Sequence, residues 1–305
     1  MNITTIGIDV SKAKLDIFFL SSGEALEIGN NTRCFKELLQ RIKSEYSVKR
    51  VIIEHTGNYQ KEVVMFLQKH GFCVCVVNPN KVRNFARAMG VAAKTDKLDA
   101  KVLAQYGDVI QPEETKVQDK NINTLKELVT FRAQLIETIK QYNNRQEKHP
   151  ISMIGKEIKK MITILQKQQK IIETKIREFI KSHDDILSKY QTLEKVQGFG
   201  EQTVSVLLAQ LPELGCLEKR KLTALCGLAP INRDSGTMKG KRTIYGGRKI
   251  VRNALYMAAV NAIRCNNVIK VYYQGLKLRG KPSKVALVAC MRKLLIYANS
   301  LLNIA

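Results

Sequence analysis

The sequence predicts an α/β domain at the N-terminus, a pair of long helices in the middle and a mainly helical C-terminal segment. Strand-like and helical apolar spacings alternate up to about residue 110, and a polar, glycine-poor stretch with heptad-like spacing follows from about 121 to 185. A hydrophobic content of 45% is enough for folded cores. We therefore expect three segments, 1–110, 111–190 and 191–305.

The first segment is predicted to form a meander of three strands followed by alternating helices and strands. Apolar runs bounded by polar links predict strands at 3–10, 15–20, 25–28, 49–53 and 72–77. Apolar residues spaced three and four apart predict helices at 32–45, 59–70, 81–89 and 96–106. This order is typical of an α/β domain.

Four carboxylates fall where this order could gather them. Asp9 lies in the first strand between apolar neighbours, where a charge is costly unless it meets a cation. Glu54 ends the fourth strand, and Asp96 and Asp99 share one helical face. If the first and fourth strands are neighbours, these ligands suit Mg²⁺ or Mn²⁺ and could hold two ions for a phosphodiester displacement. Ordinary surface and capping roles stay open for each carboxylate.

The same residues carry a resemblance to a known family. The stretches 7–12, 54–59, 77–79 and 93–100 resemble the RuvC-like DEDD domain of the insertion sequence 110 family of bacterial transposases, whose relatives include the pilin-gene invertases. The resemblance implies an RNase H-like fold for the first segment. It also implies a D-E-D-D metal site, which here corresponds to Asp9, Glu54, Asp96 and Asp99.

The middle segment is predicted to contain two long helices. Apolar positions step by three and four between residues 125 and 142 and again between 158 and 179, and Pro150 separates the two runs. The pair could form an antiparallel hairpin inside one subunit or a coiled-coil arm that joins protomers. The resemblance, weakest in this segment, implies a coiled coil that helps the protein to dimerise and to bind RNA.

A Gly-x-Gly turn opens the C-terminal segment. Gly198 and Gly200 lie between two helical stretches, the pattern of a helix-hairpin-helix, in which backbone N–H groups meet a phosphate without reading sequence. An ordinary helix-capping loop is the alternative interpretation.

Basic residues dominate the rest of this segment. The chain has a net charge of +24, which favours a nucleic-acid partner, and no Asp or Glu follows Asp234. Ser235 stands next to Asp234 in an exposed loop, with basic residues close behind that could neutralise a phosphoryl group. An ordinary turn is the alternative. The basic residues expected to contact nucleic acid are Lys12, Arg233, Lys239, Lys241, Arg242, Arg248 and Arg252.

The resemblance extends to this basic segment. The stretches 229–236, 241–242, 246–248, 251–259 and 284–295 look like the second transposase domain of the same family. In that domain a serine is the recombination nucleophile, and Ser235 matches it. The resemblance further implies a bridge RNA that pairs with donor and target DNA, and a tetramer in which the serine of one subunit meets the carboxylates of another.

Several other classes of protein are disfavoured. The seven cysteines lack paired metal-ligand spacing, which fits free thiols in a reducing bacterial cytoplasm, where we expect the protein to be associated with the nucleoid. No Walker-type glycine loop is present, so we expect no ATP requirement. No signal peptide or long apolar run is evident, so no membrane role is expected.

These patterns lead to one principal functional hypothesis and two alternatives. The principal hypothesis is a DNA transposase or recombinase that forms a 5′-phosphoserine intermediate at Ser235, with divalent metal at the four carboxylates. The first alternative is a RuvC-type junction endonuclease that uses water as its nucleophile. The second is a non-catalytic nucleic-acid-binding protein that relies on the basic segment.

Overall fold

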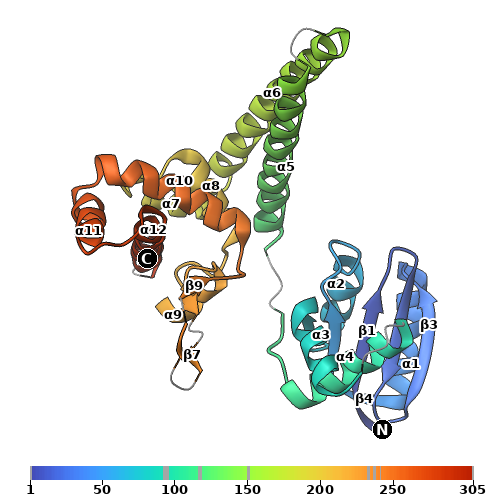
Figure 1. Ribbon diagram of the computed structural model, residues 1–305. Helices are drawn as coiled ribbons and strands as arrows, with labels where there is room; N and C mark the ends of the chain where they lie inside the picture. Colours follow the sequence, from blue (N-terminus) through green and yellow to red (C-terminus); the bar gives the residue numbers. More distant parts are fainter. Residues whose placement is uncertain are drawn as a thin grey trace. The chain divides into compact units, whose positions relative to one another are not determined.

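The chain divides into two compact units. A computed structural model describes residues 2–91, 96–115, 119–149, 152–231, 234–235, 238–240 and 242–303. The units are Met1–Val117, which contains the main sheet, and Gln118–Ala305, which is mostly helical (Figure 1). Helices α5 and α6 of the middle segment share a hydrophobic core with the C-terminal helices, so segments 111–190 and 191–305 form one packed body from residue 118 onward.

The first unit is built on a five-stranded mixed sheet with the order β3-β2-β1-β4-β5. Strands β1, β2 and β3 form an antiparallel meander, and β1, β4 and β5 run parallel. This confirms the predicted α/β character of the N-terminal segment. The strand bounds are Asn2–Val10 (β1), Lys14–Phe19 (β2), Glu24–Gly29 (β3), Tyr46–Glu54 (β4) and Val74–Val77 (β5).

Helices cover both faces of this sheet because its central strands are apolar on both sides. One core joins Ile8 and Ile53 of the sheet to side chains of α1 and α2. A second core joins Ile52 and Cys75 to side chains of α3 and α4. The helix bounds are Thr32–Glu45 (α1), Lys61–Lys69 (α2), Pro79–Ala88 (α3) and Asp96–Ile110 (α4).

Helix α4 lies unusually close to the sheet. A Cβ atom added at Gly7 of β1 would overlap the carbonyl oxygen of Ala100 in α4. A Cβ atom added at Gly107 of α4 would likewise overlap the side chain of Ile52 in β4. Glycine on each side therefore permits the helix backbone to rest directly on β1 and β4.

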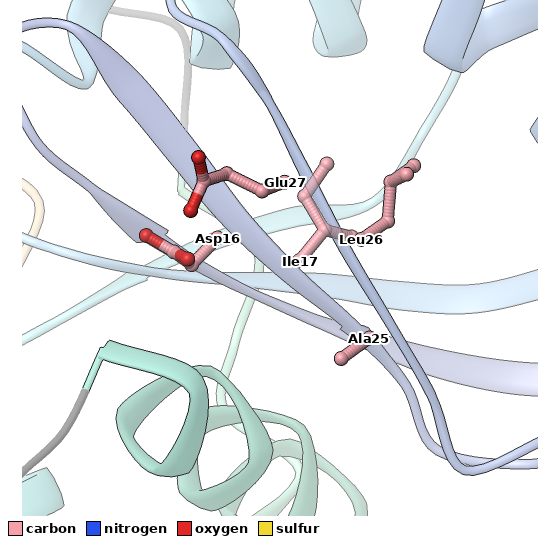
Figure 2. Close-up of a pocket in the computed structure, with 5 residues that line it drawn as sticks. All are labelled: Asp16, Ile17, Ala25, Leu26 and Glu27. Atoms are coloured by element: carbon pink, nitrogen blue, oxygen red, sulfur yellow. The ribbon is translucent and has the colours of Figure 1, made fainter.

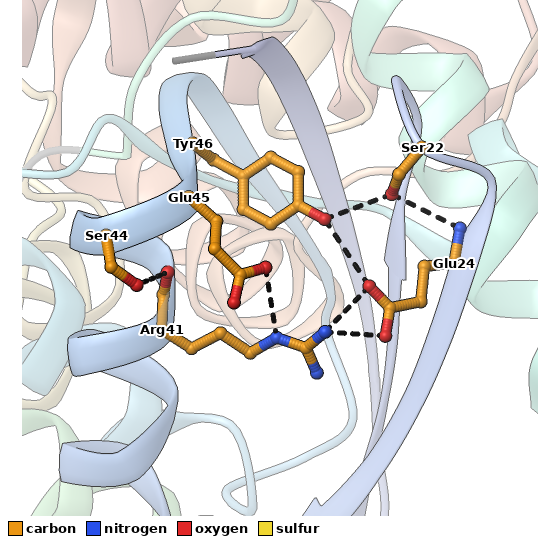
Figure 3. A network of polar contacts seen from close by, with 6 residues as sticks. All are labelled: Ser22, Glu24, Arg41, Ser44, Glu45 and Tyr46. Carbon is orange, nitrogen blue, oxygen red and sulfur yellow. Dashed lines mark hydrogen bonds and ion pairs between the residues drawn. The ribbon is translucent and has the colours of Figure 1, made fainter.

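A polar network ties α1 to the sheet at the start of β3 and β4. The Arg41 guanidinium donates to both carboxylate oxygens of Glu24, at 2.6 and 2.8 Å, and the Tyr46 hydroxyl is 3.4 Å from the same carboxylate (Figure 3). The hydrogen bond from Arg41 to Glu24 raises the pKa of Arg41. This network lies at the opposite end of β4 from Glu54, so it stabilises the sheet away from the predicted metal site.

The second unit begins with an antiparallel helix hairpin, α5 and α6, followed by shorter helices (Figure 1). Arg132 of α5 and Glu173 of α6 form an ion pair at 2.7 Å, and both side chains are largely shielded from solvent. The helix bounds are Lys120–Lys148 (α5), Met153–Lys181 (α6), Asp184–Glu194 (α7), Glu201–Gln210 (α8), Lys219–Leu225 (α9), Lys249–Cys265 (α10), Asn267–Leu278 (α11) and Ser283–Leu302 (α12).

Helix α12 is long and apolar enough to span a membrane by length and composition alone. Leu287, Met291 and Leu295 of this helix belong to the hydrophobic core of the second unit. A buried core helix passes the same test, so this helix is weak evidence for a membrane span.

Candidate active site

The two strands that carry Asp9 and Glu54 are parallel neighbours. Ile8 of β1 is paired with Ile53 of β4, so the next residue of each strand, Asp9 and Glu54, lies at the same edge of the sheet. Side chains alternate along a strand, and Ile8 and Ile53 both belong to the core under α1 and α2. Asp9 and Glu54 therefore point to the face that α4 covers, and both are half-buried.

The first turn of helix α4 contains the other two predicted ligands, Asp96 and Asp99. Asp99 precedes Ala100, the residue whose carbonyl oxygen lies against Gly7, two positions before Asp9 in β1. The Asp99 side chain is half-buried. Asp96 begins the same helix, but its side chain lies outside the described part of the chain. Among the side chains that the structure describes, no three carboxylate, histidine or cysteine groups form a metal-binding cluster.

A hydrogen-bonded asparagine joins the loops that follow β1 and β4. The Asn30 amide donates to the carbonyl oxygens of Ser11, at 2.9 Å, and of Tyr59, at 3.3 Å. These loops leave the strands just after Asp9 and Glu54, and Lys12 is exposed on the first of them. Asn30 therefore helps to fix the rim of the site. No pattern in the sequence indicates this role, because both bonds depend on the folded path of the chain.

The other carboxylate that the sequence analysis missed is Asp16. It lies in β2 directly opposite Asp9, and it is only 4% exposed. Lys14 forms an ion pair with it at 3.2 Å. The alternation of Lys14 and Asp16 with Leu15 and Ile17 could have indicated a polar face on this strand.

Ser235 lies near the tip of a small β-hairpin in the second unit. Strands β6 (Pro230–Ile231) and β9 (Thr243–Ile244) pair at its base, and β7 (Asp234–Ser235) and β8 (Met238–Lys239) pair farther out. Ser235 is paired with Met238 and its side chain is exposed. Figure 1 shows β7 projecting from the helices of its unit. An exposed hydroxyl on a hairpin strand is accessible to a large substrate.

Two of the predicted nucleic-acid contacts, Arg248 and Arg252, form hydrogen bonds next to the base of this hairpin. The Arg248 guanidinium donates to both carboxylate oxygens of Glu213, at 2.5 and 2.6 Å, and to the carbonyl oxygen of Gln210 at 2.9 Å. Arg252 donates to the carbonyl oxygen of Gly246, which follows β9 by two residues. Burial of Glu213 opposes ionisation, but hydrogen bonds and charge from Arg248 outweigh it and lower the pKa of Glu213.

The remaining predicted contacts are only partly described. Arg242 is exposed beside β9, and Lys239 is described by its backbone in β8. Arg233 and Lys241 lie outside the described residues. Nucleic-acid contact by these side chains stays a prediction.

The predicted phosphate-binding turn has one buried and one exposed glycine. Gly198 has φ +108°, and a Cβ atom there would lie 2.5 Å from the Cβ atom of Ala262 in α10. Gly200, at the N-cap of α8, is exposed with no neighbour that a Cβ atom would meet. Gly198 is therefore required for packing between the α7–α8 turn and α10, and only Gly200 is open to a ligand.

Comparison with known proteins identifies the family. Residues 6–149 match a family model for the DEDD domain of IS110 elements, described as a transposase, and residues 190–274 match the IS116/IS110/IS902 family of transposases. The chain belongs to the IS110 family of transposases. The family expected from the sequence motifs is therefore confirmed, and the chain is an enzyme of the class that cuts and joins DNA.

Individual relatives agree with this assignment. Pilin gene-inverting proteins of Moraxella bovis and Moraxella lacunata are each 28% identical to the chain, over 97% of the chain and 94% of the relative. An uncharacterized 43.6 kDa protein of insertion element IS110 from Streptomyces coelicolor is 26% identical over 43% of the chain and 32% of that protein.

The residues at the edge of the sheet fit a divalent cation. Asp9 and Glu54 carry carboxylates on adjacent parallel strands, and Asp99 lies in the first turn of α4, one residue before the Ala100 that packs on Gly7. Hard cations such as Mg²⁺ prefer oxygen ligands of this kind. The DEDD domain of IS110-type transposases is generally metal-dependent, which agrees with this chemistry.

Proposed function

We propose that this transposase cuts and rejoins DNA with Ser235 as the nucleophile and with divalent metal bound by Asp9, Glu54, Asp96 and Asp99. The observation that carries the proposal is the adjacency of Asp9 and Glu54 on parallel strands beneath α4, in a chain of the IS110 family. The exposed position of Ser235 on a hairpin in the basic segment supports its role as the nucleophile.

The proposed chemistry conserves the energy of the phosphodiester bond. The Ser235 hydroxyl oxygen bonds to phosphorus, its proton passes to a carboxylate or water, and the bond from phosphorus to the 3′ oxygen breaks. The products are a 5′-phosphoserine and a free 3′-hydroxyl. A 3′-hydroxyl from another strand then attacks the phosphoserine, which joins the strands and restores the serine. Bound divalent ions would neutralise charge on the phosphoryl oxygens.

A covalent trap tests the nucleophile. Denatured reactions of the wild-type protein with labelled DNA should contain a protein–DNA adduct, and Ser235→Ala should form none. Ser188→Ala is the matched control, because Ser188 is an exposed serine on α7 of the same unit. If nicking survives Ser235→Ala and no adduct ever forms, a RuvC-type nuclease with a water nucleophile is the better description.

We further propose that a bridge RNA selects the DNA. The net charge of +24 supports binding to a polyanion, and base pairing would supply the sequence choice that backbone contacts lack. RNA that copurifies with the protein should be a single species with two loops complementary to donor and target DNA. Recovery of random cellular RNA would contradict this proposal.

We also propose that the α5–α6 hairpin joins protomers, as part of a dimer or tetramer. Large apolar side chains are exposed along it, including Phe131, Met161, Ile164 and Ile171. Such a surface is typical of an interface. Ile164→Lys should reduce the mass of the particle in analytical ultracentrifugation, whereas Lys160→Ala, on the same helix, should leave it unchanged.

A further inference from the structure

Acidic side chains continue across the sheet beyond Asp9 and Glu54. Asp16 of β2 is paired with Asp9, and Glu27 of β3 is paired with Asp16. Directly paired residues point to the same face of a sheet, so the four carboxylates form one row across four adjacent strands. Like charges placed opposite one another destabilise a sheet, so this row requires a compensating cation.

Lys14 supplies a cation for the outer half of the row. Its ammonium nitrogen is 3.2 Å from a carboxylate oxygen of Asp16 and 3.1 Å from one of Glu27. Asp16 depends on this ion pair more than Glu27 does, because the Asp16 side chain is 6% exposed and that of Glu27 is 57% exposed. The two carboxylates lie side by side on their strands at a pocket of about 120 Å³ (Figure 2).

The position of Asp16 makes it a competitor for any cation at Asp9. The two residues are direct cross-strand partners, so their Cα atoms are about 5 Å apart. An uncompensated carboxylate at this distance would attract a divalent ion toward β2 and away from Glu54 and Asp99. The ion pair with Lys14 offsets that attraction.

We propose that Lys14 and Asp16 are positioning residues of the metal site: Lys14 holds Asp16 in an ion pair, so that Asp9 is the carboxylate of the β1–β2 pair that binds the divalent ion. This inference rests on the proposed function, because it concerns the metal at Asp9. It assigns no metal-binding role to Asp16 or Glu27 themselves.

Titration of the full-length protein with Mn²⁺ tests the inference by a readout separate from activity. Lys14→Met removes a positive charge and should tighten Mn²⁺ binding by about tenfold or add a second bound ion. Asp16→Asn removes a negative charge beside Asp9 while Lys14 keeps its positive charge, and it should weaken Mn²⁺ binding by about tenfold. The double variant should bind within about twofold of wild type, because the two changes cancel.

Two comparisons control for charge and folding. Lys36→Met makes the same charge change at an exposed position on α1 and should leave Mn²⁺ affinity unchanged. Lys14→Arg keeps the charge and should bind Mn²⁺ with an affinity within about twofold of wild type. If Lys14→Met fails to fold, Lys14→Arg and Asp16→Asn together test the inference.

The failure of this inference differs from the failure of the proposed function. If Asp9→Ala does not change Mn²⁺ binding, the proposed metal site itself is wrong. If Asp9→Ala abolishes binding while Lys14→Met and Asp16→Asn change only the melting temperature, the metal site stands. In that second case the Lys14–Asp16 pair merely stabilises the sheet, and the inference is overturned.

Discussion

The carboxylates of the first unit and the serine of the second are held in contrasting ways. Asp9 and Glu54 extend from long central strands whose neighbouring residues, Ile8 and Ile53, are fully buried. Ser235 lies on a two-residue strand and is exposed. Sheet register fixes the first pair, whereas a few contacts at the hairpin base orient the second. This contrast suits the proposed roles, because metal ligands need preorganisation and a nucleophile that meets a large substrate benefits from access.

The largest expected effect on DNA cutting comes from a substitution at the sheet carboxylates. Glu54→Gln removes one charged ligand and should lower DNA cutting by about a thousandfold, with little change in thermal stability. Strand-cutting assays with labelled DNA measure the first quantity and thermal unfolding the second. Asp108→Asn is the control, since Asp108 lies on α4 in a weak surface pair with Lys49 at 4.0 Å. This variant should cut DNA at a rate within about twofold of wild type. Full cutting by Glu54→Gln would exclude this residue from the site.

A substitution away from the carboxylates should also affect them through the packing of α4. Gly7→Ala places a methyl group where the Ala100 carbonyl oxygen now lies, so the helix must shift away from β1. We expect a loss of about 2 to 4 kcal/mol in the free energy of unfolding, measured by urea denaturation, and weaker Mn²⁺ binding. Gly275→Ala on α11 is the control, because a Cβ atom there meets no neighbour. An unchanged stability for Gly7→Ala would show that α4 can move without cost.

The hairpin that carries Ser235 should respond to changes at Arg248, the arginine beside its base. Arg248→Ala removes the bonds to Glu213 and Gln210 at the hairpin base and should lower the rate of the Ser235 adduct by about tenfold. Hydrogen exchange across residues 230–244 should accelerate at the same time. Arg242→Ala, an exposed arginine beside β9, is the matched control for charge. It should weaken DNA binding in a salt-dependent manner and leave hydrogen exchange unchanged. If Arg248→Ala weakens DNA binding in a salt-dependent manner and leaves hydrogen exchange unchanged, Arg248 contacts DNA and does not anchor the hairpin.

Features of the fold and site that depend on a pattern within one element could be predicted from the sequence. Alternation and strand order placed Asp9 and Glu54 at strand positions that the structure makes adjacent. Asp16 was missed because its importance comes from pairing with Asp9 across the meander, and such register is not encoded in either strand alone. The ion pair between Arg248, a predicted nucleic-acid contact, and Glu213 was not foreseen, because Glu213 lies 35 residues earlier in the chain. The packing of Gly198 against Ala262 was likewise not foreseen, because such a contact is a property of tertiary packing.

The smallest expected effect concerns the pH dependence of the hairpin anchor. The folded state lowers the pKa of Glu213 below its ordinary value of 4.5, chiefly because Arg248 outweighs the effect of burial. A group whose pKa is lowered by folding contributes stability above its unfolded pKa and loses it as pH falls through the folded value. The stability difference between wild type and Glu213→Gln should therefore be constant from about pH 6 to 8 and shrink below about pH 4.5. Urea denaturation at each pH measures it. A difference that persists undiminished to pH 3 would mean that the charge of Glu213 contributes nothing to holding the hairpin.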